Sequence, residues 1–397
     1  MEAVHTKKRL AVITGTRAEY GLLRPVIQKL LASEKIEPLI IVTGAHLSAE
    51  YGNTVTEIEA DGVPIAARLH ILTHGHGPLW LAETVQDTIG QFSRWFYENK
   101  PDAVLVLGDR YEIFAAAQAA ALTGVPIAHI SGGDVTLGAA DDYYRHCITK
   151  MAALHFPSCE DSARRLIRMG ENPAIVHNVG GLGDENIRGL PRMELDELSE
   201  SIGFDLHKPF ALVTFHPETA GEVDPAAQSD SLLDAIETIT AERDMHWLIT
   251  KANADAGGQI INEKIDTWVA KHPGQALTVT SLGVKRYLSA MAKAAFVAGN
   301  SSSGVVETPT FGVPTVDIGD RQNGRIRCDN VIHCEAETKA ITDAMKQAMA
   351  PDFVQKARTT VSPYFGGDTS GKIVSILETA LEDPSFGAPK GFYDGNA

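Results

Sequence analysis

The sequence predicts an α/β protein of two domains, each a doubly wound parallel sheet with helices on both faces. Short apolar runs alternate with helical stretches along most of the 397 residues. Several runs, such as AVLVL at 103–107, are apolar at every position, which is typical of a parallel strand buried on both faces. The alternation pauses once, at the polar and acidic segment 189–209, and then resumes. A chain of this length has room for two cores.

The first domain is predicted over residues 1–188. Six apolar runs are its expected strands: RLAVITG (9–15), PLIIVTG (38–44), DAVLVLGD (102–109), PIAHISGG (126–133), LHFPSC (154–159) and IVHNVGG (175–181). Helical patterns are expected at 22–33, 47–61, 113–123, 141–153 and 161–169. Segment 189–209 is expected to be a connection between the domains.

The second domain is predicted over residues 189–370 as a similar series. Its expected strands are PFALVTFHP (209–217), HWLITKAN (246–253), ALTVTSL (276–282), AFVAG (295–299) and PTVDIGDR (314–321). Helical signals fall at 229–243, 259–271, 284–294, 352–360 and 371–383. Two such Rossmann-like domains facing each other across a cleft make a GT-B-like architecture. In that architecture we expect the C-terminal helix, within 371–397, to rejoin the first domain.

Composition and charge exclude several classes of protein. A net charge of −16 argues against a nucleic-acid or anionic-membrane partner. No apolar run approaches a membrane span, and MEAVHTKKRL leads into a strand without a signal-peptide pattern, so we expect a cytoplasmic protein. The four cysteines form no CxxC pair and are expected to be free thiols. His70, His74 and His76 lack a flanking acid or thiol, so no metal site is expected.

Two glycine-containing motifs follow expected strands, where ligands of open parallel sheets bind. In TGTRAEYG (14–21), Arg17 offers a forked donor to phosphate, although a plain strand-to-helix turn explains the motif equally well. GNSSSG (299–304) is the stronger candidate, because the hydroxyls of Ser301, Ser302 and Ser303 at a helix start suit a diphosphate. A simple helix cap needs one serine and gives no reason for three. Glu307 is placed to accept ribose hydroxyls.

Candidate acid and base groups follow other strands. LGDRYE (107–112) puts Asp109 beside Arg110 at a strand end. Asp141 and Arg145 are one helical turn apart, a spacing that fits a paired carboxylate in a site or an ordinary surface pair. Carboxylates brought together can divide acid and base roles. His216 precedes a proline at a strand end and has little reason to be a core residue.

Taken in order, TGTRAEYG, VLGDRYE, HISGGD, DDYYRHCITK, FHPET, GNSSSGVVETPTFGVP and IGDRQNGR resemble the hydrolysing UDP-N-acetylglucosamine 2-epimerases. The likeness runs from about residue 8 to residue 371. The family includes enzymes of sialic-acid synthesis and relatives that act on UDP-N,N'-diacetylbacillosamine in legionaminic-acid synthesis. Non-hydrolysing relatives typically read GTRPEAIK at the first strand, so TGTRAEYG favours the hydrolysing branch.

The resemblance implies a reaction without metal or cofactor: anti elimination of UDP across C1 and C2 to a glycal, and then rehydration to the free 2-epimer. For UDP-N-acetylglucosamine the products would be N-acetylmannosamine and UDP. Family contacts to UDP or substrate carry over to a set of residues in both domains: Arg17, Gly21, Arg110, His216, Asn253, Leu282, Ser301, Ser302, Glu307 and Arg321. A homodimer or homotetramer is the family's habit.

The resemblance assigns catalytic roles to Asp109 and Asp141, with Arg145 beside them. Ser131 departs from the pattern, because many members have glutamate there and serine is a poor general base without an activating partner. Asp134, three residues later, would supply the missing carboxylate. Two other functions stay open: a GT-B glycosyltransferase, which needs the same grip on UDP, and a catalytically silent nucleotide-sugar binder, prompted by Ser131.

Overall fold

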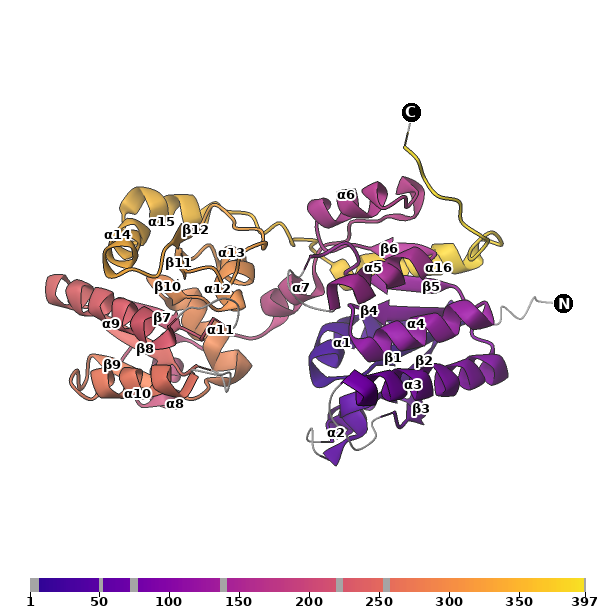
Figure 1. Cartoon of the computed structure of the whole chain (residues 1–397), viewed down its shortest axis with the longest axis horizontal. Helices are drawn as coiled ribbons and strands as arrows, with labels where there is room; N and C mark the ends of the chain where they lie inside the picture. Colours follow the sequence, from indigo (N-terminus) through magenta and orange to yellow (C-terminus); the bar gives the residue numbers. More distant parts are fainter. Residues whose placement is uncertain are drawn as a thin grey trace. The chain divides into compact units, whose positions relative to one another are not determined.

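The computed structural model of the chain describes residues 7–49, 53–71, 78–135, 141–218, 224–252 and 258–395. The chain divides into two compact units (Figure 1). Unit 1 contains Met1–Asn186 and Pro363–Ala397, and unit 2 contains Ile187–Ser362. Each has its own six-stranded sheet, in which every neighbouring pair of strands is parallel.

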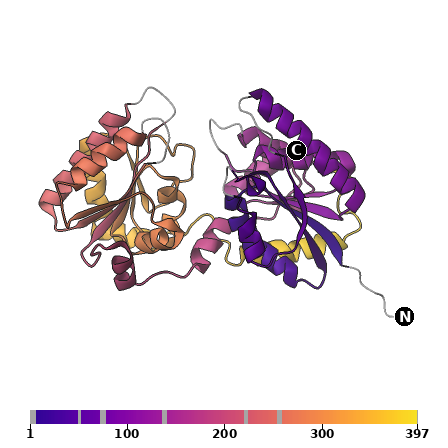
Figure 2. The same ribbon diagram turned by 90° about the horizontal axis from the view of Figure 1, so that it is seen from below.

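The sheet of unit 1 has the strand order β3-β2-β1-β4-β5-β6. Its strands are β1 (Lys8–Thr14), β2 (Ile36–Thr43), β3 (Ile65–Leu69), β4 (Ala103–Leu107), β5 (Ile127–Ile130) and β6 (Leu154–Phe156). Helices cover both faces (Figure 2). They are α1 (Arg17–Ala32), α2 (Val55–Ala60), α3 (Pro78–Asn99), α4 (Tyr111–Thr123), α5 (Asp141–Met151), α6 (Glu160–Arg168), α7 (Leu182–Gly189) and α16 (Thr369–Glu382), with short 3₁₀ turns η1 (Gly44–Leu47) and η3 (Pro173–Ile175).

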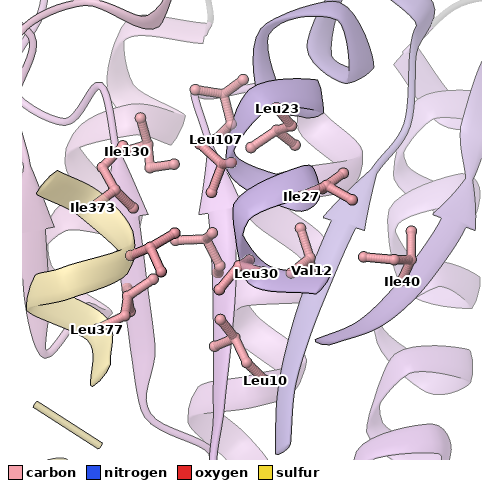
Figure 3. Packing of buried hydrophobic residues seen from close by; sticks show 14 of the residues in the cluster. Leu10, Val12, Leu23, Ile27, Leu30, Ile40, Leu107, Ile130, Ile373 and Leu377 are labelled. Atoms are coloured by element: carbon pink, nitrogen blue, oxygen red, sulfur yellow. The ribbon is translucent and has the colours of Figure 1, made fainter. Parts of the chain in front are cut away.

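The C-terminal helix α16 packs into the core of unit 1. Figure 3 shows Ile373 and Leu377 of α16 beside α1 and the central strands. Ile27 and Leu30 of α1 belong to the same fully buried cluster as Leu10 of β1. The apolar residues of each helix recur every three or four positions, so one face of each helix is buried against the sheet. The first sheet is therefore completed by a helix that follows unit 2 in the sequence.

The sheet of unit 2 has the strand order β12-β11-β10-β7-β8-β9. Its strands are β7 (Phe210–Thr214), β8 (His246–Thr250), β9 (Ala276–Val279), β10 (Phe296–Gly299), β11 (Thr315–Ile318) and β12 (Val331–Cys334). Its helices are α8 (Leu195–Ile202), α9 (Pro225–Glu242), α10 (Gly258–Val269), α11 (Gly283–Lys293), α12 (Ser302–Val306), α13 (Thr308–Phe311), α14 (Thr338–Ala348) and α15 (Pro351–Arg358). Trp247 and Phe296 meet edge to face in its core, with ring centroids 6.1 Å apart.

The two sheets share one topology. Counted from the first strand of its own unit, each sheet has the order 3-2-1-4-5-6. In such sheets the connections leave to opposite sides at the boundary between the first and fourth strands, and ligands bind beyond the carboxyl ends there. The switch points are β1/β4 in unit 1 and β7/β10 in unit 2. The predicted class, two doubly wound parallel α/β domains, is confirmed.

Several elements differ from the sequence-based expectation. The long helix α3, the edge strands β3 and β12, and α14 were not predicted. The strand expected at 175–181 is wrong: Val176 makes a single bridge to His155. Segment 189–209 is more than a connection, because it forms α8 and buries Leu198 completely in the core of unit 2.

Within the described residues, no helix combines the length and apolar composition needed to cross a bilayer.

Candidate functional site

The loop after β1 and the loop after β4 meet at the switch point of unit 1. Gly15 lies against the carboxyl of Glu112, such that a Cβ on Gly15 would be 2.9 Å from Glu112 Oε1. A larger residue at position 15 would therefore displace the Glu112 side chain. Glu112 Oε1 accepts a hydrogen bond of 2.6 Å from Arg110 Nε. The side chain of Arg110 is 43% exposed, so its other edge reaches solvent.

Asp109 follows β4 and pairs with Arg145 of α5. Arg145 is 7% exposed and also donates from Nη1 to the carbonyl oxygen of Asp134 at 2.8 Å. Burial raises the pKa of Asp109 above its ordinary value. The Arg145 guanidinium opposes this shift, and Asp141 and Asp134 add to it. A half-buried carboxyl whose pKa is raised is a candidate for proton transfer.

Ser131 and Asp134 occupy the loop after β5. Ser131 has a φ of +62°, an unusual conformation for serine that costs on the order of 1 kcal/mol. Its N–H donates to the carbonyl of Phe156 at 2.9 Å. Asp134 Oδ1 accepts the hydroxyls of Ser158 and Ser162 at 2.9 and 2.5 Å. One oxygen of Asp134 is thus committed to the segment that begins α6.

Asp141 lies exposed at the start of α5. The proposed i, i+4 pair with Arg145 does not form: the carboxylate of α5 within 4 Å of Arg145 is Asp142, at 3.4 Å. Arg145 is buried and pairs with Asp109 instead. Asp141 still acts on Asp109 electrostatically.

Arg17 and Gly21 both lie on α1. Arg17 is the first residue of that helix, and its side chain is 73% exposed and pairs with Glu57 at 2.9 Å. The Gly21 carbonyl accepts a hydrogen bond from Asn186 Nδ2 at 2.8 Å, and a Cβ on Gly21 would meet nothing within 4 Å. Arg17 is therefore available to a ligand only by exchanging a surface ion pair, which costs little.

The loops after β7 and β10 meet at the switch point of unit 2. Gly299 has a φ of +133°, and a Cβ there would lie 1.9 Å from the carbonyl oxygen of Thr214, so glycine is required. The buried amide of Asn300 then bridges to His216. Its Oδ1 accepts from His216 N at 2.7 Å and its Nδ2 donates to His216 O at 2.8 Å. His216 and the loop GNSSSG at 299–304, called the serine loop below, are thus held side by side.

The serine hydroxyls do not serve as a helix cap. Ser301 occupies the N-cap position of α12, yet its side chain makes no capping hydrogen bond. Ser301 Oγ instead lies 3.1 Å from Ser303 Oγ, which lies 2.6 Å from the hydroxyl of Tyr287 on α11. Tyr287 is linked in turn to Thr214 at 3.4 Å. The hydroxyl of Tyr287 therefore orients the hydroxyls of Ser303 and Ser301. The sequence analysis did not single out this tyrosine.

Glu307 and Arg321 flank that loop. Burial raises the pKa of Glu307 to about 7. Arg321 Nη1 donates to the carbonyl of Asn300 at 3.2 Å, which joins the loop after β11 to the serine loop. Leu282 is 3% exposed and packs in the core, so a ligand contact there falls to its backbone. Asn253, like His74 and His76, lies outside the described residues.

The sequence analysis identified the polar residues at the ends of strands but missed the residues that position them. Glu19, Glu112, Asp142, Tyr287 and Asn300 were not singled out. Glu19, Glu112, Asp142 and Asn300 lie inside motifs quoted above, and this was the signal that the sequence offered for them. Tyr287 carried no such signal, because an aromatic residue on an amphipathic helix is usually part of the core.

The two switch points support different chemistry. In unit 1, burial raises the pKa of Asp109, which pairs with Arg145 and is followed in the sequence by the partly exposed Arg110, an arrangement suited to proton transfer beside a bound anion. In unit 2, hydroxyls, a strand-end histidine and a buried carboxyl surround a glycine loop, which suits a nucleotide diphosphate.

Comparisons with known proteins identify the family of the chain. The family described as UDP-N-acetylglucosamine 2-epimerase matches residues 28–378. A GDP/UDP-N,N'-diacetylbacillosamine 2-epimerase (hydrolyzing) of Campylobacter jejuni is 35% identical, over 88% of this chain and 90% of the relative. Polysialic acid biosynthesis protein P7 of Escherichia coli is 35% identical, over 98% and 97%. A UDP-N,N'-diacetylbacillosamine 2-epimerase (hydrolyzing) of Legionella pneumophila is 34% identical, over 94% and 96%.

Solved structures resemble the fold. The UDP-GlcNAc 2-epimerase of Neisseria meningitidis bound to UDP-GlcNAc has a TM-score of 0.75 at 19% identity, covering 94% of this chain and 100% of that one. The enzyme of Methanocaldococcus jannaschii has a TM-score of 0.73 at 18% identity, covering 94% and 99%. Family match and relatives together show that the chain is an enzyme that belongs to the UDP-N-acetylglucosamine 2-epimerase family.

Proposed function

We propose that the protein is a hydrolysing UDP-sugar 2-epimerase, which converts a UDP-2-acetamido sugar and water into UDP and the free 2-epimer. The observation that carries the proposal is the half-buried Asp109, whose pKa burial raises, paired with Arg145 at the switch point of unit 1. Two relatives, at 35% and 34% identity, are named as hydrolysing 2-epimerases of GDP/UDP-N,N'-diacetylbacillosamine and of UDP-N,N'-diacetylbacillosamine.

In the proposed reaction the substrate first loses UDP by elimination. A base removes the proton from C2, the C1–C2 double bond forms, and the C1–O bond breaks with its electron pair leaving on the diphosphate. We assign the leaving group to Arg17, Arg110 and the serine loop, because arginine and hydroxyl donors stabilise the charge that develops on phosphate oxygens. The carboxyl of Glu307 and the backbone of Leu282 are assigned to the nucleoside, with His216 and Arg321 beside it.

Rehydration completes the reaction. Water adds its hydroxyl to C1 of the glycal, and C2 receives a proton on the face opposite to the one from which it lost a proton. We assign Asp109 and Asp141 to the two proton transfers at C2, the removal in the elimination and the delivery in the rehydration. Arg145 favours the ionised form of Asp109. Asp134 is the weaker candidate, since one of its carboxylate oxygens already binds two serine hydroxyls. Ser131 needs no proton-transfer role in this scheme.

The substrate has two candidates. UDP-N-acetylglucosamine follows from the family's description, and a meningococcal UDP-N-acetylglucosamine 2-epimerase is 29% identical over 98% of this chain. UDP-N,N'-diacetylbacillosamine is favoured by the names of the two relatives at 34% and 35% identity. We propose UDP-N-acetylglucosamine, supplying the mannosamine-type sugar for nonulosonic acid synthesis, as the first substrate to test.

The decisive experiment incubates the purified protein with each UDP-sugar separately in D₂O and follows the products by NMR. We expect UDP and a free 2-epimeric sugar that carries deuterium at C2. Product without deuterium at C2 contradicts the elimination, and turnover only in the presence of a sugar acceptor identifies a glycosyltransferase.

A variant tests the role of Asp109. Asp109→Asn keeps the size of the side chain and removes the ionisable group, so kcat should fall at least about 100-fold. Affinity for UDP should stay within about threefold, because hydrogen bonds near C2 are not made to UDP. Activity in Asp109→Asn close to that of the unaltered protein would remove Asp109 from the mechanism.

A further inference from the structure

Two buried carboxyls lie together at the switch point of unit 1. Glu112 of α4 is 1% exposed and Glu19 of α1 is 7% exposed. The Glu112 carboxyl rests against Gly15, whose N–H donates to Glu19 Oε2 at 2.8 Å. Both side chains therefore contact the same residue of the loop after β1. Neither carboxyl has a place in the reaction scheme above.

Each carboxyl positions one of the two arginines, Arg17 and Arg110, that we assign to the diphosphate. Glu19 Oε2 accepts the backbone N–H groups of Gly15 and Thr16, at 2.8 and 2.9 Å, and closes a capping box with Thr16. This fixes the turn from which Arg17 projects. Glu112 Oε1 accepts Arg110 Nε at 2.6 Å and so fixes the second arginine.

The other oxygen of each carboxyl is buried without a hydrogen-bond partner in the part of the chain that the structure describes. These atoms are Glu19 Oε1 and Glu112 Oε2. Two ionised carboxyls in a dry environment beside one guanidinium would repel each other, and each unpaired oxygen would be costly. A proton on Glu19 removes one of the two charges and turns its free oxygen into a donor.

Other ionisable groups near the pair come from three elements. Arg110, in the loop after β4, attracts both carboxylates, and Tyr111 begins α4 beside it. His46 of η1 donates its backbone N–H to the Gly15 carbonyl at 3.2 Å. Burial lowers the pKa of His46 to about 4, so the imidazole is neutral and does not compensate the carboxyls. Burial and the Glu112 charge raise the pKa of Glu19 to about 8.

We propose that Glu19 is a positioning residue, held in its protonated form, which lets Glu112 alone orient Arg110 toward the diphosphate of the substrate. The inference rests on the proposed function, since it takes a diphosphate as the ligand of Arg110. Arginine has five N–H donors, and Glu112 takes the Nε edge, so the exposed edge stays available for phosphate oxygens. When Glu19 loses its proton, a second carboxylate faces Arg110 and lowers the positive potential that attracts the anion.

The test compares the unaltered protein with Glu19→Gln between pH 7 and about pH 9, a range in which a terminal phosphate is already almost fully ionised. Glutamine accepts the same backbone N–H groups, supplies a donor and never ionises. Isothermal titration calorimetry gives Kd for UDP, and initial rates of UDP release give KM and kcat. For the unaltered protein we expect Kd and KM to rise about five- to tenfold over this range, with less change in kcat.

In Glu19→Gln the rise in Kd and KM should be absent. Glu185→Gln is the matched control, because Glu185 also accepts a backbone N–H in unit 1, from Ser370 at 2.7 Å, and it should keep the rise. An equal alkaline rise in Glu19→Gln and in the unaltered protein overturns the proposal.

A second variant keeps the proposal testable if Glu19→Gln fails to fold. Glu112→Gln removes the charge that holds the proton on Glu19, so the alkaline rise should move to lower pH; an unmoved midpoint overturns the proposal. UDP release with identical pH profiles in all variants refutes this inference alone. A Kd profile that flattens in Glu19→Gln, without UDP release from any UDP-sugar, refutes the proposed function alone.

Discussion

At the scale of single residues, burial decides how the ionisable groups of both units behave. Glu307 shows this most simply, since burial is the one cause that raises its pKa, from 4.5 to about 7. Burial also raises the pKa of Asp109, but there the Arg145 guanidinium opposes the effect of burial. A carboxyl near its pKa at neutral pH can either accept a ligand's hydroxyl hydrogens or give up a proton. Its role then depends on which partner approaches.

Glu307→Gln is expected to weaken UDP binding about tenfold at pH 8. If the Glu307 carboxylate accepts ribose hydroxyls, UDP affinity of the unaltered protein should rise from pH 6 to pH 7, below the range in which Glu19 loses its proton, because ionisation near pH 7 creates the acceptor. Calorimetric titration with UDP measures both effects. A variant that retains the full pH dependence would assign that dependence to another group.

The same substitution makes a prediction about stability. The folded pKa of Glu307 lies above the unfolded one, so the cost of ionising it in the fold grows between about pH 4.5 and 7 and is complete above pH 7. Glu307→Gln should therefore raise Tm at pH 8 and change it little at pH 4. Scanning calorimetry at both pH values tests this; an equal change at both would contradict the sign.

Tyr287→Phe tests the support beneath the serine loop. Loss of the hydroxyl leaves Ser303 without its 2.6 Å partner, and we expect UDP affinity to fall about fivefold, equivalent to about 1 kcal/mol. Ser289→Ala on the same helix removes a buried hydroxyl that accepts Met193 N at 2.9 Å, away from the loop. That control should lower stability without changing UDP affinity. Equal UDP affinities in both variants would deny Tyr287 its orienting role.

At the scale of elements, the C-terminal tail after α16 anchors α5, the helix that carries Asp141 and Arg145. Lys390 donates to the carbonyls of Thr149, in the last turn of α5, and of Ala152, just after the helix, at 3.1 and 2.6 Å. It also bonds Glu171, whose side chain is fully buried. Burial alone would raise the pKa of Glu171, but bonds from His155, Lys150 and Lys390 together lower it to about 2. The tail therefore closes a buried ionic network.

Lys390→Met should destabilise the protein by about 2 kcal/mol at pH 7, because Glu171 loses one of its charged partners in a buried place. The stability that ionised Glu171 contributes is present above about pH 4.5 and is lost as the pH falls toward 2, so the difference should narrow in acid. Urea unfolding at several pH values measures it. Lys35→Met, which breaks an exposed pair with Glu382 of α16, is the control and should change stability much less. Equal losses in both variants would place the tail among ordinary surface contacts.

At the scale of the whole molecule, the two units have sheets of the same topology. Each sheet has one switch point, β1/β4 in unit 1 and β7/β10 in unit 2. The copy in unit 2 presents hydroxyls and a glycine loop, while the copy in unit 1 presents carboxyls and arginines. Under the proposed function the loops of unit 2 bind the nucleotide, while those of unit 1 supply arginines for the diphosphate and carboxyls that act on the sugar. Division of labour between two similar sheets follows from their loops, since the sheets themselves are alike.

Hydrogen exchange can separate these two roles. UDP alone should slow amide exchange at 299–307 in unit 2. The Asp109→Asn protein loaded with UDP-sugar should also show slower exchange at 129–134 in unit 1, because only the intact substrate brings the sugar ring. Peptides of α16 serve as an internal control and should not change. Equal protection of 129–134 by UDP alone would contradict this assignment.

The sequence by itself determined the fold class and most elements, because strand and helix periods are local properties of the chain. It also determined which polar residues follow strands, and therefore that Asp109, His216 and the serine loop lie at the carboxyl ends of strands. It did not reveal α3, although Phe92 and Phe96 are spaced as a buried helical face and are 0% and 1% exposed. The glycines and histidines that precede Pro78 in the sequence hid the start of that pattern.

Tertiary structure alone decided which of these residues meet. Strand order is not written in any local period, so the contacts of Glu112 with Gly15 and of Asn300 with His216 appear only once β1 lies beside β4 and β7 beside β10. The same holds for Arg145, which the helical spacing paired with Asp141 and the fold pairs with Asp109 and Asp142. A side chain's partner and its pKa depend on burial and on neighbours distant in the sequence, and packing fixes both.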